Sequence, residues 1–299
     1  MTNIVNLFAS PEKSKKEPSK QDSPKTEKLE KDSLKADSIG EVFLVGAGPG
    51  DPELITVKAM RLLQQADAIV YDRLANPLLL DYARKHCDLI YVGKKKDQHS
   101  LPQDQICALL AALAGCGKKV VRLKGGDPFI FGRGGEEVEH LAEQGIACTI
   151  VPGITAAIGC AATTQIPLTH RDHAHAVTFI TGHRQHGKMY INWDLALQKD
   201  STVVFYMGLS NLPEITSELI ARGCPGDKPF AVVAQGTAET QQVLVGTVSD
   251  IAERLARHPL PSPALLIMGD VINANGYAQH LADLTGAAQP LSAEMLEVI

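Results

Sequence analysis

The sequence predicts an α/β fold with two domains, the first built on a parallel sheet and the second on a mixed sheet. Short apolar, β-branched runs alternate with helix patterns through the first half of the chain. Two glycine-rich turns, GAGPGD at 46–51 and GGDP at 125–128, directly follow such runs. In the second half, two strand patterns lie too close together for a helical crossover, which indicates an antiparallel hairpin.

Composition narrows the class of protein. The 299 residues are 44% hydrophobic and 21% charged, as in ordinary globular enzymes. The net charge of −5 argues against a nucleic-acid partner. We expect no membrane association, because the chain has no apolar stretch near 18 residues and no signal-peptide pattern. The six cysteines form no CxxC pair, so reduced thiols and a cytoplasmic location are predicted.

Four segments are predicted along the chain. Residues 1–40 are rich in Lys, Glu, Asp, Ser and Pro and are expected to form a disordered tail. Residues 41–171 form the first α/β domain and residues 172–278 the second. Residues 279–299 have weaker patterning and are expected to be a C-terminal tail.

The first domain is expected to contain five strands, at 41–45, 68–71, 89–92, 119–123 and 149–151. One helix is predicted to begin at Asp51, which serves as its N-cap with Pro52 in the first position. Its apolar stripe consists of Ile55, Ala59, Leu62, Leu63 and Ala66. Further helices are predicted near 78–85, 102–114, 134–144 and 154–163. This alternation favours parallel strands joined by right-handed crossovers.

The second domain is expected to contain helices near 211–222 and 248–257. Its predicted strands are Val177–Thr181, Thr202–Met207, Phe230–Ala234, Val243–Gly246 and Ala264–Met268. The third and fourth of these form the predicted hairpin.

The GAGPGD turn does not fit a dinucleotide site. The third glycine of that fingerprint falls on Asp51, and Pro49 removes an N–H group that a pyrophosphate needs. The chain also has no GxxxxGK[ST] phosphate loop. A turn of this kind is either a plain strand–helix connection or a site for a neutral or cationic ligand close to the backbone. The second turn, GGDP, favours the ligand site.

Eight motifs occur in the order GAGPGDPELIT (46–56), YDRL (71–74), VGKK (92–95), RLKGGDPFIFGRGGEE (122–137), VPGITAA (151–157), IPLTHRD (166–172), TGH (181–183) and FYMG (205–208). Together they resemble the uroporphyrinogen-III C-methyltransferases of the tetrapyrrole methylase superfamily. The resemblance runs from about Gly40 to Asn275. The dehydrogenase–ferrochelatase module that precedes this enzyme in some bacteria has no counterpart here, so a stand-alone methyltransferase is expected.

The resemblance implies that S-adenosylmethionine binds in a cleft between the two domains and leaves as S-adenosylhomocysteine, with no metal. The cofactor contacts that it implies are Pro49, Gly125, Gly126, Asp127, Ile130, Thr155, Ala156, Met207 and Gly236. This cofactor has no phosphate, and its sulfonium and ammonium groups are cationic, so a carboxylate at Asp127 is favourable. Ile130, Ala156 and Met207 are expected to frame the adenine.

The implied substrate, uroporphyrinogen III, carries eight carboxylates and calls for basic side chains. The basic candidates are Lys94, Lys95, Lys96, Arg122, Lys124, Arg133, His170, Arg171 and Arg184. Arg133 is the strongest, because guanidinium binds carboxylate bidentately. Glu136 either orients Arg133 at helical spacing or hydrogen-bonds pyrrole N–H groups. Met207 and His183 complete the expected substrate contacts with Lys94.

The implied reaction is methylation of tetrapyrrole carbons 2 and 7, giving precorrin-2 by way of precorrin-1. Asp72 and Lys94 are by resemblance the proton acceptor and donor, and Arg133 is grouped with them as catalytic. Alternatively Asp72 only caps a turn or pairs with Arg73, and Lys94 only binds a substrate carboxylate. The family implies a homodimer and a place in siroheme, cobalamin or heme d1 biosynthesis. Other interpretations are a different precorrin methyltransferase, or a non-catalytic sensor of S-adenosylmethionine or a tetrapyrrole.

Overall fold

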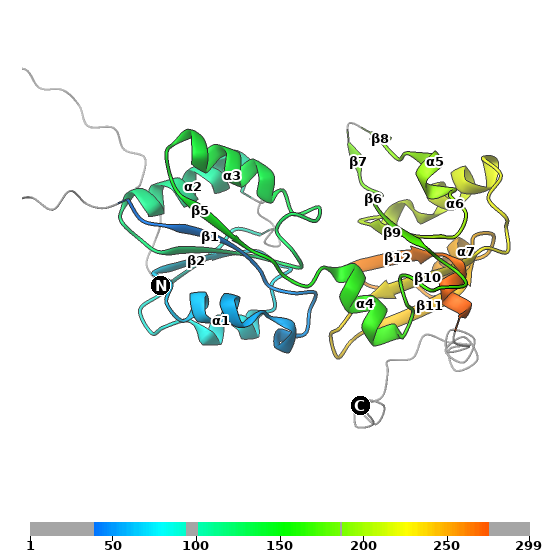
Figure 1. Cartoon of the computed structure of the whole chain (residues 1–299), viewed down its shortest axis with the longest axis horizontal. Helices are drawn as coiled ribbons and strands as arrows, with labels where there is room; N and C mark the ends of the chain where they lie inside the picture. Colours follow the sequence, from blue (N-terminus) through cyan, green and yellow to red (C-terminus); the bar gives the residue numbers. More distant parts are fainter. Residues whose placement is uncertain (1–38, 94–100, 186, 275–299) are drawn as a thin grey trace, which may run out of the picture. The chain divides into compact units, whose positions relative to one another are not determined.

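The computed structural model describes residues 39–93, 101–185 and 187–274, which contain two five-stranded sheets with helices on both faces of each (Figure 1). The tails predicted at 1–40 and 279–299 lie outside the described residues, apart from Ile39 and Gly40. Within the described ranges, no helix is both long enough and apolar enough to cross a membrane.

The first sheet is entirely parallel, as predicted, with strand order β3-β2-β4-β1-β5. Its strands are β1 (Val42–Gly46), β2 (Ala68–Tyr71), β3 (Asp88–Tyr91), β4 (Val120–Lys124) and β5 (Cys148–Val151). The third strand begins and ends one residue earlier than expected. A parallel sheet is covered on both faces, which explains why β1 and β2 are continuous apolar runs.

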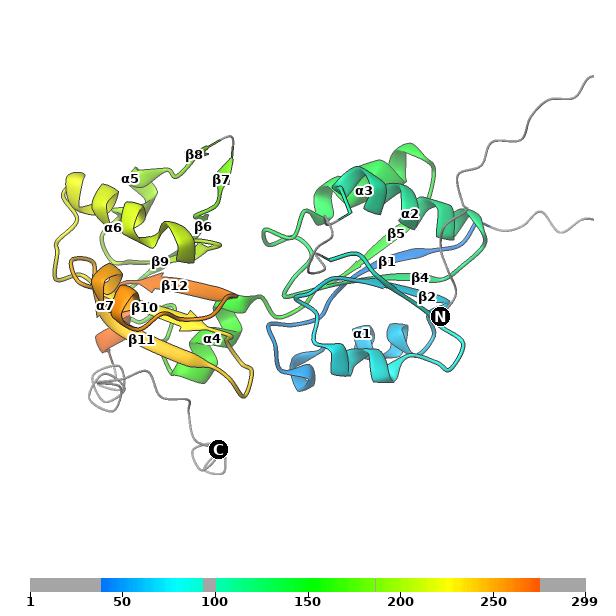
Figure 2. The same ribbon diagram turned by 180° about the vertical axis from the view of Figure 1, so that it is seen from behind.

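The two faces of the first sheet carry different helices (Figures 1 and 2). Val42 and Leu44 of β1 pack on the face covered by α2 (Gln103–Gly115) and α3 (Gly134–Glu143). The alternate residues Phe43 and Val45 pack with α1 (Val57–Leu63) and η2 (Pro77–Tyr82) on the opposite face. This alternation decides on which face each side chain of the strands lies.

The helix predicted to begin at Asp51 is divided in two. Asp51 caps only the short 3-10 helix η1 (Pro52–Leu54), where its side chain accepts the Glu53 N–H at 2.8 Å. Ile55 is extended, and α1 begins after Thr56, whose Oγ1 accepts the Ala59 N–H at 3.2 Å. A second capping residue five positions after the first therefore starts a new helix.

The prediction of an α-helix near 78–85 was wrong in the type of helix. The chain forms the 3-10 helix η2 there, and the side chain of Asn76 caps it by accepting the Leu78 N–H at 2.9 Å. The other three predicted helices of this half form α2, α3 and α4 (Ala156–Thr164), with ends within two residues of those expected.

The second sheet is mixed, as predicted, with order β11-β10-β12-β9-β6. The strands are β6 (Ala176–Thr181), β9 (Ser201–Tyr206), β10 (Pro229–Ala234), β11 (Gln242–Thr247) and β12 (Ala264–Met268). β6 and β9 pair in parallel, and β10 and β11 form the predicted antiparallel hairpin. The strand expected to reach Met207 ends at Tyr206, because Met207 turns to a positive φ of 55°.

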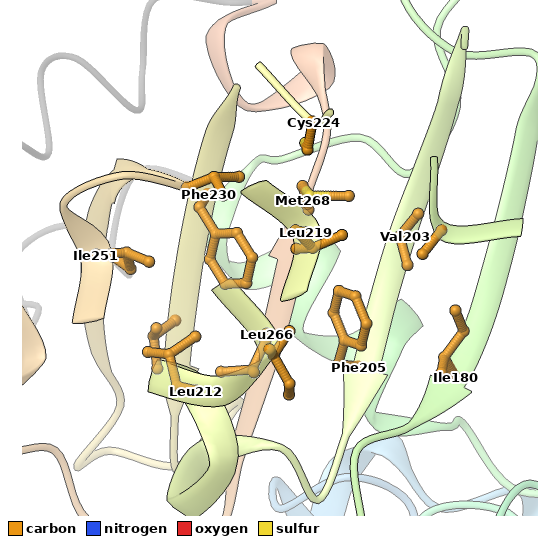
Figure 3. Packing of buried hydrophobic residues seen from close by; sticks show 14 of the residues in the cluster. Ile180, Val203, Phe205, Leu212, Leu219, Cys224, Phe230, Ile251, Leu266 and Met268 are labelled. Carbon is orange, nitrogen blue, oxygen red and sulfur yellow. The ribbon is translucent and has the colours of Figure 1, made fainter. Parts of the chain in front are cut away.

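Two apolar clusters flank the second sheet. On one face, Phe205 and Phe230 stack with ring centroids 6.4 Å apart beneath α6 (Leu212–Ala221) and α7 (Ile251–Arg257) (Figure 3). On the other face, Ala157 and Cys160 of α4 pack with side chains of this sheet. The domain boundary predicted between residues 171 and 172 stays a prediction, and α4 packs on the sheet that follows it.

Several short elements had no clear sequence signal. They are the two-stranded β7 (Arg184–Gln185) and β8 (Lys188–Met189), the single-turn α5 (Trp193–Ala196), and the 3-10 helices η3 (Leu209–Asn211) and η4 (Asp270–Asn273). Each is too short to show the periodicity on which such predictions depend.

The core of the second sheet yields a stability prediction. Leu219 on α6 is fully buried, whereas its neighbour Ile220 is 46% exposed. We expect Leu219→Ala to lower the free energy of unfolding by about 2–5 kcal/mol, because the truncation leaves a cavity. Ile220→Ala is the matched control and should cost less than about 1 kcal/mol. Urea denaturation measures both, and equal losses would contradict the packing described.

Candidate functional site

At the carboxyl ends of the strands of the first sheet, three turns contact one another through the backbone atoms of glycine residues. They follow β1, β4 and β5. Gly48 donates its N–H to the Gly126 oxygen at 3.2 Å, and Gly126 donates to the Gly48 oxygen at 2.7 Å. A Cβ added to Gly46 would lie 2.5 Å from Gly153 Cα, and one on Gly153 would lie 2.2 Å from the Gly126 oxygen. No side chain fits at Gly46 or Gly153, so these glycines are required by contact.

Asp127 joins two of these turns. Its Oδ1 accepts the Phe129 N–H at 2.8 Å, and its Oδ2 accepts the Gly153 N–H at 3.0 Å. The sequence interpretation assigned this carboxylate to a cationic ligand alone. The structure adds a role that the sequence interpretation missed, since both carboxylate oxygens hold backbone while the negative charge stays at the turn.

The implied cofactor fits the backbone of the GGDP turn. Gly126 has a φ of +67°, and a Cβ added there meets nothing closer than 3.9 Å, where Thr155 Cα and Ala156 N lie. A Cβ there would make only ordinary van der Waals contact with two predicted cofactor residues, Thr155 and Ala156, so this side of Gly126 is open in the sense that it is not crowded. Gly125 differs, because a Cβ added there would lie 2.4 Å from Leu74 Cβ. The open side of Gly126 is therefore where a ligand can approach the chain closely.

The GAGPGD turn also meets the turn that contains Gly236. Asp51 donates its N–H to Thr237 Oγ1 at 2.9 Å, and a Cβ added to Gly50 would lie 2.8 Å from the Gly236 oxygen. Pro49 packs on α4, since its Cγ would lie 2.5 Å from a Cβ added to Gly159. These contacts bring Pro49 and Gly236, two predicted cofactor residues 187 positions apart, into one region.

Tyr206 links this region to the start of α4, a role that the sequence interpretation missed. Its hydroxyl lies 2.7 Å from Thr155 Oγ1 and accepts the Ala157 N–H at 3.1 Å. Its ring lies 4.9 Å from that of Phe131, centroid to centroid. Burial raises the pKa of Tyr206, so the hydroxyl stays protonated. The available signal was its place within the FYMG motif.

Two predicted substrate residues follow neighbouring strands. Met207 comes directly after β9, and His183 comes two residues after β6. The strands pair in parallel with Thr181 opposite Tyr206, and Gly182 donates its N–H to the Tyr206 oxygen at 2.7 Å. The side chain of Met207 is 49% exposed, and His183 is also exposed. Both residues therefore lie at one edge of the second sheet, open to a ligand.

Arg133 and Glu136 form a bidentate ion pair at the start of α3. Arg133 Nε donates to Glu136 Oε1 at 2.8 Å, and Nη2 donates to Oε2 at 2.7 Å. These hydrogen bonds raise the pKa of Arg133 and lower that of Glu136. Both side chains are more than half exposed. The structure shows Glu136 paired with Arg133, and a hydrogen bond from pyrrole N–H groups to Glu136 stays a prediction.

Asp72 pairs with a cation that the sequence interpretation placed elsewhere. Its Oδ2 accepts from Arg122 Nη2 at 2.9 Å, and its Oδ1 accepts the Leu74 N–H at 3.0 Å. Its partner is thus Arg122 and not Arg73. Arg122 and Lys124 were expected to bind substrate carboxylates, and this was wrong, because both are buried and bound to acidic side chains. Burial lowers the pKa of Lys124.

The remaining basic candidates divide by position. Lys94, Lys95 and Lys96 lie outside the described residues. Arg184 pairs with Glu214. Arg171 is exposed, and His170 forms a turn in which the Asp172 N–H is donated to its Nδ1 at 3.1 Å. Across the described ranges, no three His, Cys, Asp or Glu side chains gather as metal ligands.

Backbone strain is concentrated at these turns. Seven non-glycine residues in the described part of the chain have positive φ, and five belong to the turns described here. The five are Phe131, Arg133, Met207, Gln235 and Thr237. Such conformations persist where the surroundings hold them, and they gather at functional sites. The strain supports these turns as the functional edge of both sheets.

The fold and this site define a class of protein. The model of the family described as Tetrapyrrole (Corrin/Porphyrin) Methylases matches residues 41–252, and the chain belongs to this family. It is 52% identical over 236 residues to the siroheme synthase of Thioalkalivibrio sulfidiphilus (strain HL-EbGR7), covering 79% of this chain and 48% of that protein. It is 54% identical over 233 residues to the siroheme synthase of Pseudomonas entomophila (strain L48), covering 78% and 50%. The chain thus spans about half the length of these relatives.

Solved structures show the same fold. The uroporphyrin-III C-methyltransferase of Thermus thermophilus, complexed with S-adenosylhomocysteine, matches with a TM-score of 0.68 and 37% identity, over 79% of this chain and 100% of that one. A cobalt precorrin-4 methyltransferase matches with a TM-score of 0.70 and 26% identity, over 79% and 98%. The fold predicted from the motifs is confirmed.

Gly236 yields a test of the packing at the site. A Cβ added there would lie 2.2 Å from the sulfur of Cys160, whose pKa burial raises to about 12, so the sulfur is a neutral packing atom. We expect Gly236→Ala to lower the free energy of unfolding by about 1–3 kcal/mol. Adding Cys160→Ala should recover most of that loss, measured by thermal unfolding.

Gly135→Ala is the matched control for this substitution. A Cβ added to Gly135 on α3 meets nothing within 4 Å, so its stability should stay the same or rise. If the losses from Gly236→Ala and Cys160→Ala simply add, the close contact is not the cause.

Proposed function

We propose that this chain is an S-adenosylmethionine-dependent uroporphyrinogen-III C-methyltransferase that methylates carbons 2 and 7 to give precorrin-2 by way of precorrin-1. The observation that carries the proposal is the gathering of the predicted cofactor residues at touching turns, with the open side of Gly126 beside Thr155 and Ala156. Relatives named siroheme synthase support siroheme as the pathway that uses the product. The structural match to a uroporphyrin-III C-methyltransferase supports the substrate.

The residues of the site match the needs of this chemistry. When bound, S-adenosylmethionine supplies a methyl group already activated on its sulfonium, so the protein must mainly align the reactants. Asp127 places a negative charge at the turn, which favours a cationic ligand there. The open side of Gly126 lets the ligand reach the backbone. Ile130, Ala156 and Met207 offer apolar contact for the adenine.

The same proposal assigns roles toward the tetrapyrrole. Arg133, exposed and held by Glu136, binds a substrate carboxylate by exchanging one carboxylate partner for another. Each methyl transfer leaves a cationic ring that loses one proton, and Asp72 at the end of β2 accepts it. Lys94 acts as the proton donor, and Met207 and His183 contact the tetrapyrrole ring. A homodimer, a cytoplasmic location and the absence of a metal belong to the same proposal.

The test is an anaerobic incubation of the protein with uroporphyrinogen III and S-adenosylmethionine, with the product read by mass and absorbance. We expect a gain of two methyl groups. A gain of one group on a later precorrin only would favour another precorrin methyltransferase. If calorimetry shows that S-adenosylhomocysteine binds but no methyl group is transferred, the interpretation as a non-catalytic sensor is favoured.

Arg133→Ala should lower kcat/KM for the tetrapyrrole by at least about tenfold, because a charge-assisted bidentate contact is lost. Arg257→Ala is the matched control, since Arg257 is an exposed arginine paired with Glu253 at helical spacing on α7. Its kcat/KM should match that of the wild type. Equal activity of both variants would remove Arg133 from the site.

A further inference from the structure

Four charged side chains form a buried charge network on one face of the first sheet. They are Asp72, Arg122, Lys124 and Glu137. Arg122 and Lys124 alternate along β4, and Arg122 lies opposite Val70 of β2, two residues before Asp72. Val70 packs on the face covered by α2 and α3. Residues two apart share a face, so Asp72, Arg122 and Lys124 lie beneath the helix that carries Glu137.

Glu137 is the inner end of this network. Its side chain is fully buried, and its Oε1 accepts from Lys124 Nζ at 3.0 Å, Gln103 Nε2 at 3.0 Å and Arg122 Nε at 3.3 Å. Its Oε2 has no hydrogen-bond partner among the described residues. A buried carboxylate needs such partners, so Glu137 holds both cations in place.

Arg122 carries this restraint outward. Beyond Glu137, its Nη1 donates to the Leu123 oxygen at 2.9 Å and the Val70 oxygen at 3.4 Å, and its Nη2 donates to Asp72 Oδ2 at 2.9 Å. Its side chain is 4% exposed, whereas that of Asp72 is 26% exposed. The planar guanidinium is therefore held through Nε and Nη1, and its Nη2 donates to a carboxylate that a ligand can reach.

Stability alone is a weak explanation for this arrangement. Two acids and two bases balance in charge, but buried ion pairs are often no more stabilising than apolar residues of similar volume. Arg122 and Lys124 also repel each other. Burial is the main cause of the lowered pKa of Lys124, and this repulsion is the second. What the network does achieve is a fixed orientation for the one member that reaches the functional edge.

We propose that Arg122 is a positioning residue that fixes the Asp72 carboxylate for proton transfer, and that Glu137 in turn fixes Arg122. This inference rests on the proposed function, in which Asp72 accepts the proton released after methyl transfer. It extends the site inward from the strand ends to α3, which has Arg133 as its N-cap and Glu136 in its first turn.

The first experiment separates kcat from binding. In Arg122→Met, kcat for methyl transfer should fall by at least about tenfold, because misplacing a reacting group by about 1 Å has large effects on rate. The KM for S-adenosylmethionine and the affinity for S-adenosylhomocysteine should change by less than about threefold. Arg122→Lys, which keeps the charge but not the fork, should recover part of the loss.

The second experiment is a double-mutant cycle with Asp72→Asn. If Arg122 acts through Asp72, adding Arg122→Met to Asp72→Asn should lower kcat by less than about twofold further. Losses that multiply in the double variant would show a merely structural role and overturn the inference. If Arg122→Met fails to fold, the nearly isosteric Glu137→Gln replaces it in the same cycle. Glu137→Gln should lower kcat when Asp72 is present but not in the Asp72→Asn background.

Lys228→Met is the matched control and should leave kcat unchanged, because Lys228, just before β10, forms a 2.8 Å ion pair with Asp270 of η4, away from Asp72. Outcomes for the two proposals differ. A wild-type protein that transfers no methyl group contradicts the proposed function. An active wild type with full kcat in both Arg122→Met and Glu137→Gln contradicts this inference alone. Full kcat in Asp72→Asn contradicts this inference and also the role of Asp72 as proton acceptor in the proposed function.

Discussion

Backbone contact between Gly46, Gly126 and Gly153 is the constraint on which the site depends. Gly46 ends β1, whereas Gly126 and Gly153 lie in the turns after β4 and β5, and a Cβ at Gly46 or Gly153 would collide with the backbone of a neighbouring turn. Turns that touch this closely cannot move independently, because interiors packed at this density have no free volume to absorb a shift. The paired hydrogen bonds between Gly48 and Gly126 then set the register of the turns.

Polar groups complete what the glycines begin. Asp127 holds backbone N–H groups on both sides of the contact, and Tyr206 holds the start of α4 through Thr155 and Ala157. Deeper in the first sheet, Glu137 and Arg122 hold Asp72. Each of these carboxylates or hydroxyls bridges segments far apart in the chain. Rigid placement of this kind is what a methyl transfer from an activated donor requires of its protein, since alignment is the main contribution left to it.

The sequence allowed the sheets to be predicted because their signals are local. β1 and β2 are continuous apolar runs, and the hairpin of β10 and β11 follows from the short spacing between two apolar runs. Helix starts were harder, because Asp51 and Thr56 are both good caps and only tertiary packing decides which one starts a full helix. The identity of the partner of Asp72 had no local signal at all. Arg122 lies 50 residues away, and the pairing depends on the register between β2 and β4.

The misassignment of Arg122 and Lys124 has a physical explanation that bears on the site. Both stand in a motif beside the glycine turn, and basic residues beside a site for an acidic substrate are expected to face it. Strand alternation turns them instead toward α3, where a fully buried glutamate binds them. A buried cation that already binds carboxylates of the protein offers little to a substrate carboxylate, because its donors are occupied and its surroundings exclude the incoming charge with its water. In the proposed function, the charge in the motif therefore acts through Asp72 at the edge, and recognition of the acidic substrate is assigned to exposed cations such as Arg133.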